Sequence, residues 1–101
     1  MVMPKQRVVI DNEAKKALRE IYLYIRQDSL QNAEKVKAKM LASIKELLKN
    51  PERHAPDKYR LNNDGSYHAY EIYKYRISYH VSPAEIRVLR IRHTKMNPLE
   101  Y

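Results

Sequence analysis

The hydrophobic pattern of the chain changes from one period to another near its middle. Between residues 12 and 49 apolar side chains recur every three or four positions, which is the period of an amphipathic helix. From residue 59 to residue 93 the chain is instead rich in tyrosine, isoleucine and valine, as strands are. A short β-branched segment, residues 7–10, precedes the helical part. This order of elements predicts an α+β fold in which helices cover one face of a sheet.

The helical half divides into two helices. Asp11 and Asn12 carry side chains that cap helix starts, so the first helix is expected to begin there. Asp28 and Ser29 interrupt the apolar pattern, and a second helix is expected from this point to Asn50, since a proline disfavours helical geometry in the residue before it. The short break predicts an antiparallel helical hairpin.

The second half is expected to form an antiparallel β-meander. The one glycine, Gly65, follows two asparagines and an aspartate and marks a tight turn, and Pro83 marks another. The connection near Lys74 carries no such turn signal. No repeat or linker divides residues 1–101, so a single domain is expected. The expected strands are residues 59–61, 67–73, 75–81 and 85–92.

The charge balance and the missing residue types limit the function. Lysine and arginine total 20 against 12 acidic residues, and the resulting net charge of +8 favours a nucleic acid or an acidic protein as partner. The absence of cysteine excludes disulfides and thiol chemistry and fits a cytoplasmic protein. The four histidines lack metal-ligand spacing and one glycine makes no phosphate-binding loop, so no metal or cofactor is expected. No apolar run is long enough for a membrane span.

Basic side chains gather in the last quarter of the chain. Period two places Arg76 on the polar side of its strand, whereas the mixed pattern of the last strand leaves the register of Arg90 and Arg92 open. Together with Lys95 these arginines form a candidate site for a phosphate or a macromolecular target, with tyrosine rings beside it. The alternative is that the arginines form ion pairs with acidic neighbours, for which the candidates are Asp57, Glu71 and Glu85.

His93 is a candidate catalytic residue if the chain hydrolyses RNA. A metal-independent ribonuclease needs a general base, a general acid and cations around the phosphate. His93 is suited to either of the first two roles and Arg76 to the third. A lone histidine at a strand end is more often structural or solvated, so this assignment applies only if the protein is a ribonuclease.

Two adjacent segments near the C-terminus resemble the ParE/RelE toxin superfamily. They are the YRISY segment that begins at Tyr75 and the RIRHT segment that ends at Thr94, and the order of elements agrees from Val8 to about Pro98. The resemblance implies a toxin of a type II toxin-antitoxin system, of the plasmid-stabilisation kind, neutralised by an acidic antitoxin. Within the superfamily, ParE-like members act on DNA gyrase and RelE-like members cleave messenger RNA in the ribosome.

The resemblance is closer to the ParE-like members. Arg76 matches the family arginine of the penultimate strand, and His93 falls where several RNA-cleaving members keep a histidine. Those RNA-cleaving members also carry a tyrosine where this chain has Thr94, and Tyr101 lies further along. Asp57 falls near an acidic position of some relatives. We therefore expect a ParE-like gyrase inhibitor. The alternatives are a RelE-like ribosome-dependent endoribonuclease acting on messenger RNA and a non-toxic binding module for nucleic acid or protein.

Overall fold

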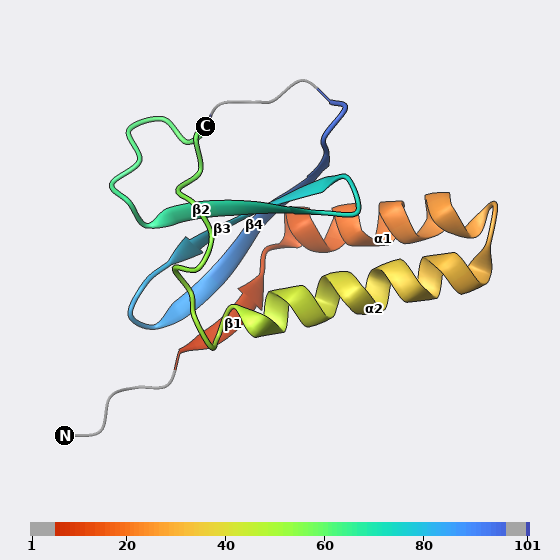
Figure 1. The fold of residues 1–101 in the computed structure, drawn as a ribbon, viewed down its shortest axis with the longest axis horizontal. Coiled ribbons are helices and arrows are strands. Elements are labelled where there is room, and N and C mark those ends of the chain that lie inside the picture. The colour runs from red at the N-terminus through yellow and green to blue at the C-terminus, as the bar shows by residue number, and fades with distance from the viewer. Residues whose placement is uncertain (1–5, 97–100) are drawn as a thin grey trace.

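The computed structural model describes residues 6–96 and 101, and it shows an α+β fold (Figure 1). The α+β prediction, with a strand, a helical hairpin and a meander in that order, is confirmed. No helix in the described part of the chain is long and apolar enough to cross a membrane. The elements in chain order are β1 (Arg7–Ile10), α1 (Asn12–Arg26), α2 (Leu30–Glu46), β2 (Tyr67–Ile72), β3 (Tyr75–Val81) and β4 (Glu85–His93).

The sheet is mixed and places β4 in its interior. Its strand order is β1-β4-β3-β2, with antiparallel pairs from β2 to β4 and a parallel pair between β1 and β4. In that parallel pair Val8 lies opposite Ile86 and Ile10 opposite Val88. The first strand of the chain therefore completes the sheet beside the last one.

The helical hairpin follows the predicted pattern, with one shorter end. Ser29 is the N-cap of α2, and its hydroxyl accepts a hydrogen bond from the backbone N–H of Asn32 at 3.0 Å. The second helix was expected to reach Asn50, but α2 ends at Glu46 and a turn follows. Leu47 in this turn is fully buried, which holds the end of the helix against the core.

The core lies between the hairpin and one face of the sheet. Tyr79 is its largest side chain and is fully buried, with its hydroxyl donating to the backbone oxygen of Pro51 at 2.7 Å. This bond satisfies a polar group that burial would otherwise leave unpaired. The other face of the sheet carries no helix (Figure 1), and we call it the open face. The buried core residues are Ala14, Val36, Met40, Ile44, Leu47, Ile77, Tyr79, Ile86, Val88 and Ile91.

Two connections differ from the sequence prediction. Residues 59–61 were expected to form a strand, but they form a turn, in which the backbone N–H of Arg60 donates to the oxygen of Asp57 at 3.2 Å. The hairpin between β2 and β3 turns through Tyr73 and Lys74, at φ of 51° and 67°. Positive φ at both central residues is usual for a tight hairpin, but glycine or asparagine usually supplies it, so no turn signal is visible in the sequence at Tyr73 and Lys74.

A β-bulge settles the register of β4. Tyr79 pairs with Val88 but Ser78 pairs with Arg90, which leaves Leu89 between two registers. Because side chains alternate along a strand, this extra residue lets Val88 face the core while Arg90 and Arg92 face the open side. The bulge therefore explains why polar and apolar residues do not alternate regularly along this strand.

Candidate functional site

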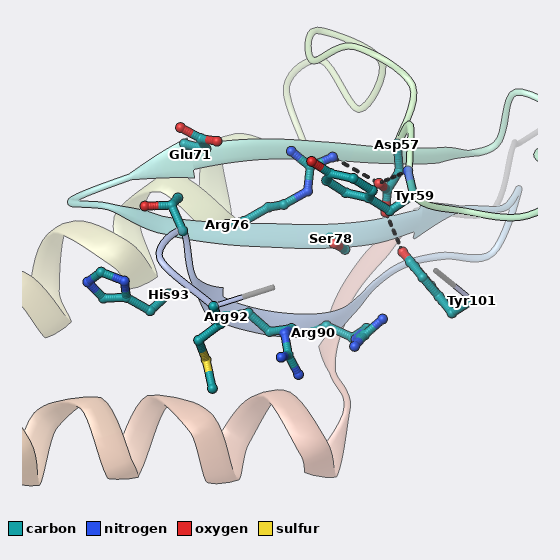
Figure 2. A pocket seen from close by; sticks show the side chains of 11 residues that line it. Asp57, Tyr59, Glu71, Arg76, Ser78, Arg90, Arg92, His93 and Tyr101 are labelled. Atoms are coloured by element: carbon teal, nitrogen blue, oxygen red, sulfur yellow. Dashed lines mark hydrogen bonds and ion pairs between the residues drawn. The ribbon is translucent and has the colours of Figure 1, made fainter. Parts of the chain in front are cut away.

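Arginines from two strands meet on the open face beside a loop and the C-terminal residue. Arg76 on β3 lies directly opposite Arg92 on β4, and Ser78 lies opposite Arg90. With Asp57 and Tyr101 these side chains line a small cavity of about 70 Å³ (Figure 2). The structure thus brings together three of the four residues proposed for target or phosphate binding. The fourth, Lys95, is exposed just beyond the strand.

The buried carboxylate of Asp57 organises this site. Asp57 is 2% exposed, and its Oδ1 accepts hydrogen bonds from Arg76 Nη2 at 2.9 Å and from the backbone N–H of Tyr59 at 3.0 Å. Its Oδ2 accepts a hydrogen bond from the Tyr101 hydroxyl. Burial raises the pKa of Asp57, but the bonds from Tyr101, Arg76 and Tyr59 outweigh it and hold that pKa below its usual value. Asp57 is therefore an ionised acceptor and not a proton donor near neutral pH.

Arg76 is occupied by this carboxylate. Its guanidinium forms the ion pair with Asp57 and lies 4.8 Å from the centre of the Tyr59 ring, so it connects β3 to the loop. Its Nε is buried and has no hydrogen-bond partner among the described residues. These contacts make Arg76 a positioning residue for the loop.

Ion pairing accounts for a second arginine as well. Arg87 donates to Glu85 at 2.7 Å and to Asp11 at 3.2 Å. Glu71, the third acidic candidate, forms no ion pair in the described part of the chain, although it borders the cavity. The ion-pair interpretation of the basic residues is thus correct for Arg76 and Arg87.

His93 faces away from Arg76. It pairs with Tyr75, whose side chain shares the helix-covered face with Ile77, and its ring packs edge-to-face on the Tyr75 ring at 5.1 Å. Its Nδ1 accepts the backbone N–H of Lys95 at 3.0 Å, which leaves the proton of the neutral ring on Nε2. His93 borders the cavity at the strand end, but the pleat directs the two candidate catalytic side chains to opposite faces.

Tyr101 is the member of the site that the sequence did not reveal. Its backbone N–H donates to the oxygen of Tyr59 at 3.0 Å, and its own oxygen accepts the N–H of Leu61 at 2.6 Å. Its ring centre lies 5.0 Å from the guanidinium carbon of Arg60 and 4.7 Å from that of Arg90. Burial, and then the hydrogen bond to Asp57, raise the pKa of Tyr101 to about 12. No local pattern marks a contact between residues so far apart in sequence.

The nearby tyrosine ring on β2 is also engaged. Arg60 lies 4.0 Å from the centre of the Tyr67 ring and donates to its hydroxyl at 3.0 Å, while the His80 ring lies 4.4 Å from the same ring. The Tyr67 ring is therefore already packed against the Arg60 guanidinium and the His80 ring. No cluster of three or more metal-ligating side chains occurs within residues 6–96 and 101.

Two solved structures share the fold of this chain. The structure resembles the chromosomal ParDE system from P. aeruginosa, with a TM-score of 0.70 and 19% identity over 90% of this chain and 98% of that one. It also resembles the YoeB dimer from Staphylococcus aureus, with a TM-score of 0.56 and 16% identity over 88% and 97% of the two chains. At these identities the likeness concerns the fold alone.

Sequence comparison identifies the family. The model of the ParE toxin of the type II toxin-antitoxin system parDE matches residues 8–98, so this chain belongs to the ParE toxin family. A search of curated proteins finds no match. The predicted resemblance to ParE-like toxins is thereby confirmed.

Proposed function

We propose that this ParE-family toxin inhibits DNA gyrase in the cytoplasm and that an acidic antitoxin neutralises it. Membership of the ParE family supports the gyrase target over the ribosome. The observation that carries the choice is the opposite orientation of Arg76 and His93 on their paired strands. A ribonuclease needs an acid, a base and a cation converging on one phosphate, and here Arg76 is bound to Asp57 while His93 packs on Tyr75.

The target-binding surface is the edge of the open face where β4 ends. Arg90 and Arg92 project from this strand on the open side and Lys95 follows them, exposed. Arg92 forms no ion pair with any described residue, so its guanidinium fork is available to an acidic group of the target. Arg76, on the neighbouring strand β3, supports this surface by fixing the loop that carries Tyr59.

A supercoiling assay with purified gyrase tests the proposal. The wild-type toxin should block supercoiling. Arg92→Gln should reach the same inhibition only at a protein concentration at least about tenfold higher, because one charge-assisted contact is lost. Arg19→Gln is the matched control, since Arg19 is an exposed arginine on α1 and does not line the cavity. Inhibition that is unchanged in Arg92→Gln would remove this residue from the target surface.

A parallel assay on translating ribosomes examines the ribonuclease alternative. The message should remain intact, at a sensitivity that detects cleavage slowed by roughly 10²- to 10⁴-fold, as expected when an acid or base is missing. Codon-positioned cuts that vanish in His93→Ala, with gyrase unaffected, would establish the RelE-like activity and overturn the gyrase proposal.

Charge governs the proposed neutralisation. A domain with a net charge of +8 should attract an acidic antitoxin, so the association rate should fall as salt rises from low to moderate concentration. A rate constant that does not change with salt would contradict electrostatic steering.

Expression without the antitoxin should stop colony growth, and normal growth with confirmed folded protein would favour the non-toxic binding module.

A further inference from the structure

The contacts around Tyr101 form a receptor for a single aromatic ring with a hydroxyl group. We call Asp57, Arg60, Arg90 and the backbone of Tyr59 the ring receptor. We propose that the ring receptor is a binding site for a tyrosine side chain of a partner protein, and that Tyr101 occupies it until the partner's ring displaces it. This inference goes beyond the proposed function, because it holds whichever target the toxin has.

The walls of the ring receptor select an aromatic ring. The guanidinium groups of Arg60 and Arg90 lie 5.0 and 4.7 Å from the centre of the Tyr101 ring, within the range of cation–π contacts. The Tyr67 ring stands perpendicular to it at 6.5 Å, in the edge-to-face arrangement that aromatic pairs prefer. An aliphatic side chain in the same place would gain none of these interactions.

The floor of the ring receptor selects a hydroxyl group. Asp57 Oδ1 already accepts from Arg76 and from the backbone of Tyr59, whereas Oδ2 accepts from the Tyr101 hydroxyl (Figure 2). A ring without a donor would leave this buried oxygen without that bond, which is unfavourable. A phosphate or carboxylate ligand would face the negative charge of Asp57. One neutral O–H donor therefore fits best, and this is the chemistry of tyrosine.

Two members of the ring receptor, Asp57 and Arg60, are held by contacts that do not involve Tyr101. Arg76 and the Tyr59 backbone hold Asp57 in place through bonds that do not involve Tyr101. Arg60 is held independently by its hydrogen bond to the Tyr67 hydroxyl. Tyr101 itself lies outside the hydrophobic core and is partly exposed, so its displacement breaks its backbone hydrogen bonds with Tyr59 and Leu61 but costs no core packing. A partner's tyrosine thus meets a preformed site, which lowers the ordering cost of binding.

Complementation of a truncated side chain tests the proposal. Tyr101→Ala empties the ring receptor, and N-acetyltyrosinamide should then stabilise the variant, with Tm rising by about 4–8 °C at roughly five times the dissociation constant. N-acetylphenylalaninamide, which lacks the hydroxyl, should give at most a small rise. Tyr24→Ala is the matched control, because Tyr24 is a 68% exposed tyrosine on α1 and its removal creates no receptor.

A second variant keeps the test decisive if Tyr101→Ala does not fold. Tyr101→Phe retains the ring but loses the bond to Asp57, so N-acetyltyrosinamide should bind it more tightly than it binds the wild-type chain. Equal binding of the tyrosine and phenylalanine amides, or binding of neither to either variant, would overturn the proposal. Stabilisation by guanosine instead of the tyrosine amide would also overturn it, since the site would then accept a nucleobase.

Discussion

Replacing Asp57 by asparagine should reveal how much of the free energy of unfolding depends on the contacts of this buried carboxylate. Asp57→Asn keeps the size of the side chain but removes the charge that pairs with Arg76 and one acceptor oxygen. Loss of one partner of a buried ion pair costs about 3–5 kcal/mol. The lower end applies, because the Arg76 side chain is 20% exposed and water can solvate it in the variant. We therefore expect a loss of about 3 kcal/mol, or roughly 12–24 °C in Tm.

Urea unfolding followed by circular dichroism measures this change, with Asp28→Asn as the control. Asp28 is an exposed aspartate between the helices, and its substitution should change the free energy of unfolding little.

The low pKa of Asp57 makes the effect depend on pH, since the contribution of its charge is complete above about pH 4 and is lost as the pH falls below that value. The difference between wild type and Asp57→Asn should thus be constant from pH 7 to pH 5 and shrink in acid. This reasoning would be refuted if Asp57→Asn lost no more free energy of unfolding than Asp28→Asn. It would also be refuted if the difference from wild type did not shrink in acid.

Three other predictions concern separate parts of the fold. Ser29→Ala should lower the free energy of unfolding by about 0.5–2 kcal/mol in urea, because the N-cap bond to the backbone of α2 is lost. Lys74→Gly should raise it by up to about 1 kcal/mol in the same assay, because glycine adopts the positive φ of this turn without steric cost. Stability should fall as the pH rises from about 10 towards 12, because folding raises the pKa values of Tyr79 and Tyr101 to about 12; an alkaline titration of Tyr101→Phe should show a smaller fall.

The elements of the fold were predictable because each has a local cause. Apolar spacing marks the two helices, and Ser29 supplies a side chain that bonds to the first turn of α2. The β-branched and tyrosine-rich segments mark β2, β3 and β4. The short turn after α2 was not predictable in the same way, since Leu47 continues the helical apolar pattern and only its packing in the core shows where the helix ends.

The site was less predictable because its contacts are not local. Arg90 was recognised as a candidate, but its face depended on the bulge at Leu89, and no residue type marks that bulge. The pairing of Asp57 with Tyr101 joins a loop to the far end of the sequence, and side-chain chemistry alone gave no reason to connect them. His93 was assigned to one site with Arg76 from residue type, whereas their directions depend on strand register.

The interior position of β4 sets the order in which the chain can become structured. During synthesis, α1, α2, β2 and β3 all emerge before Glu85, yet β1 and β3 both need β4 as their neighbour in the sheet. A nascent chain that stops before β4 also lacks Ile86, Val88 and Ile91 from the core. The helical hairpin can form early from local contacts, whereas closing β1 onto β4 must bring together nearly opposite ends of the chain, which is slow. The arginines on β4 therefore take up their places on the open face only when the last strand is inserted.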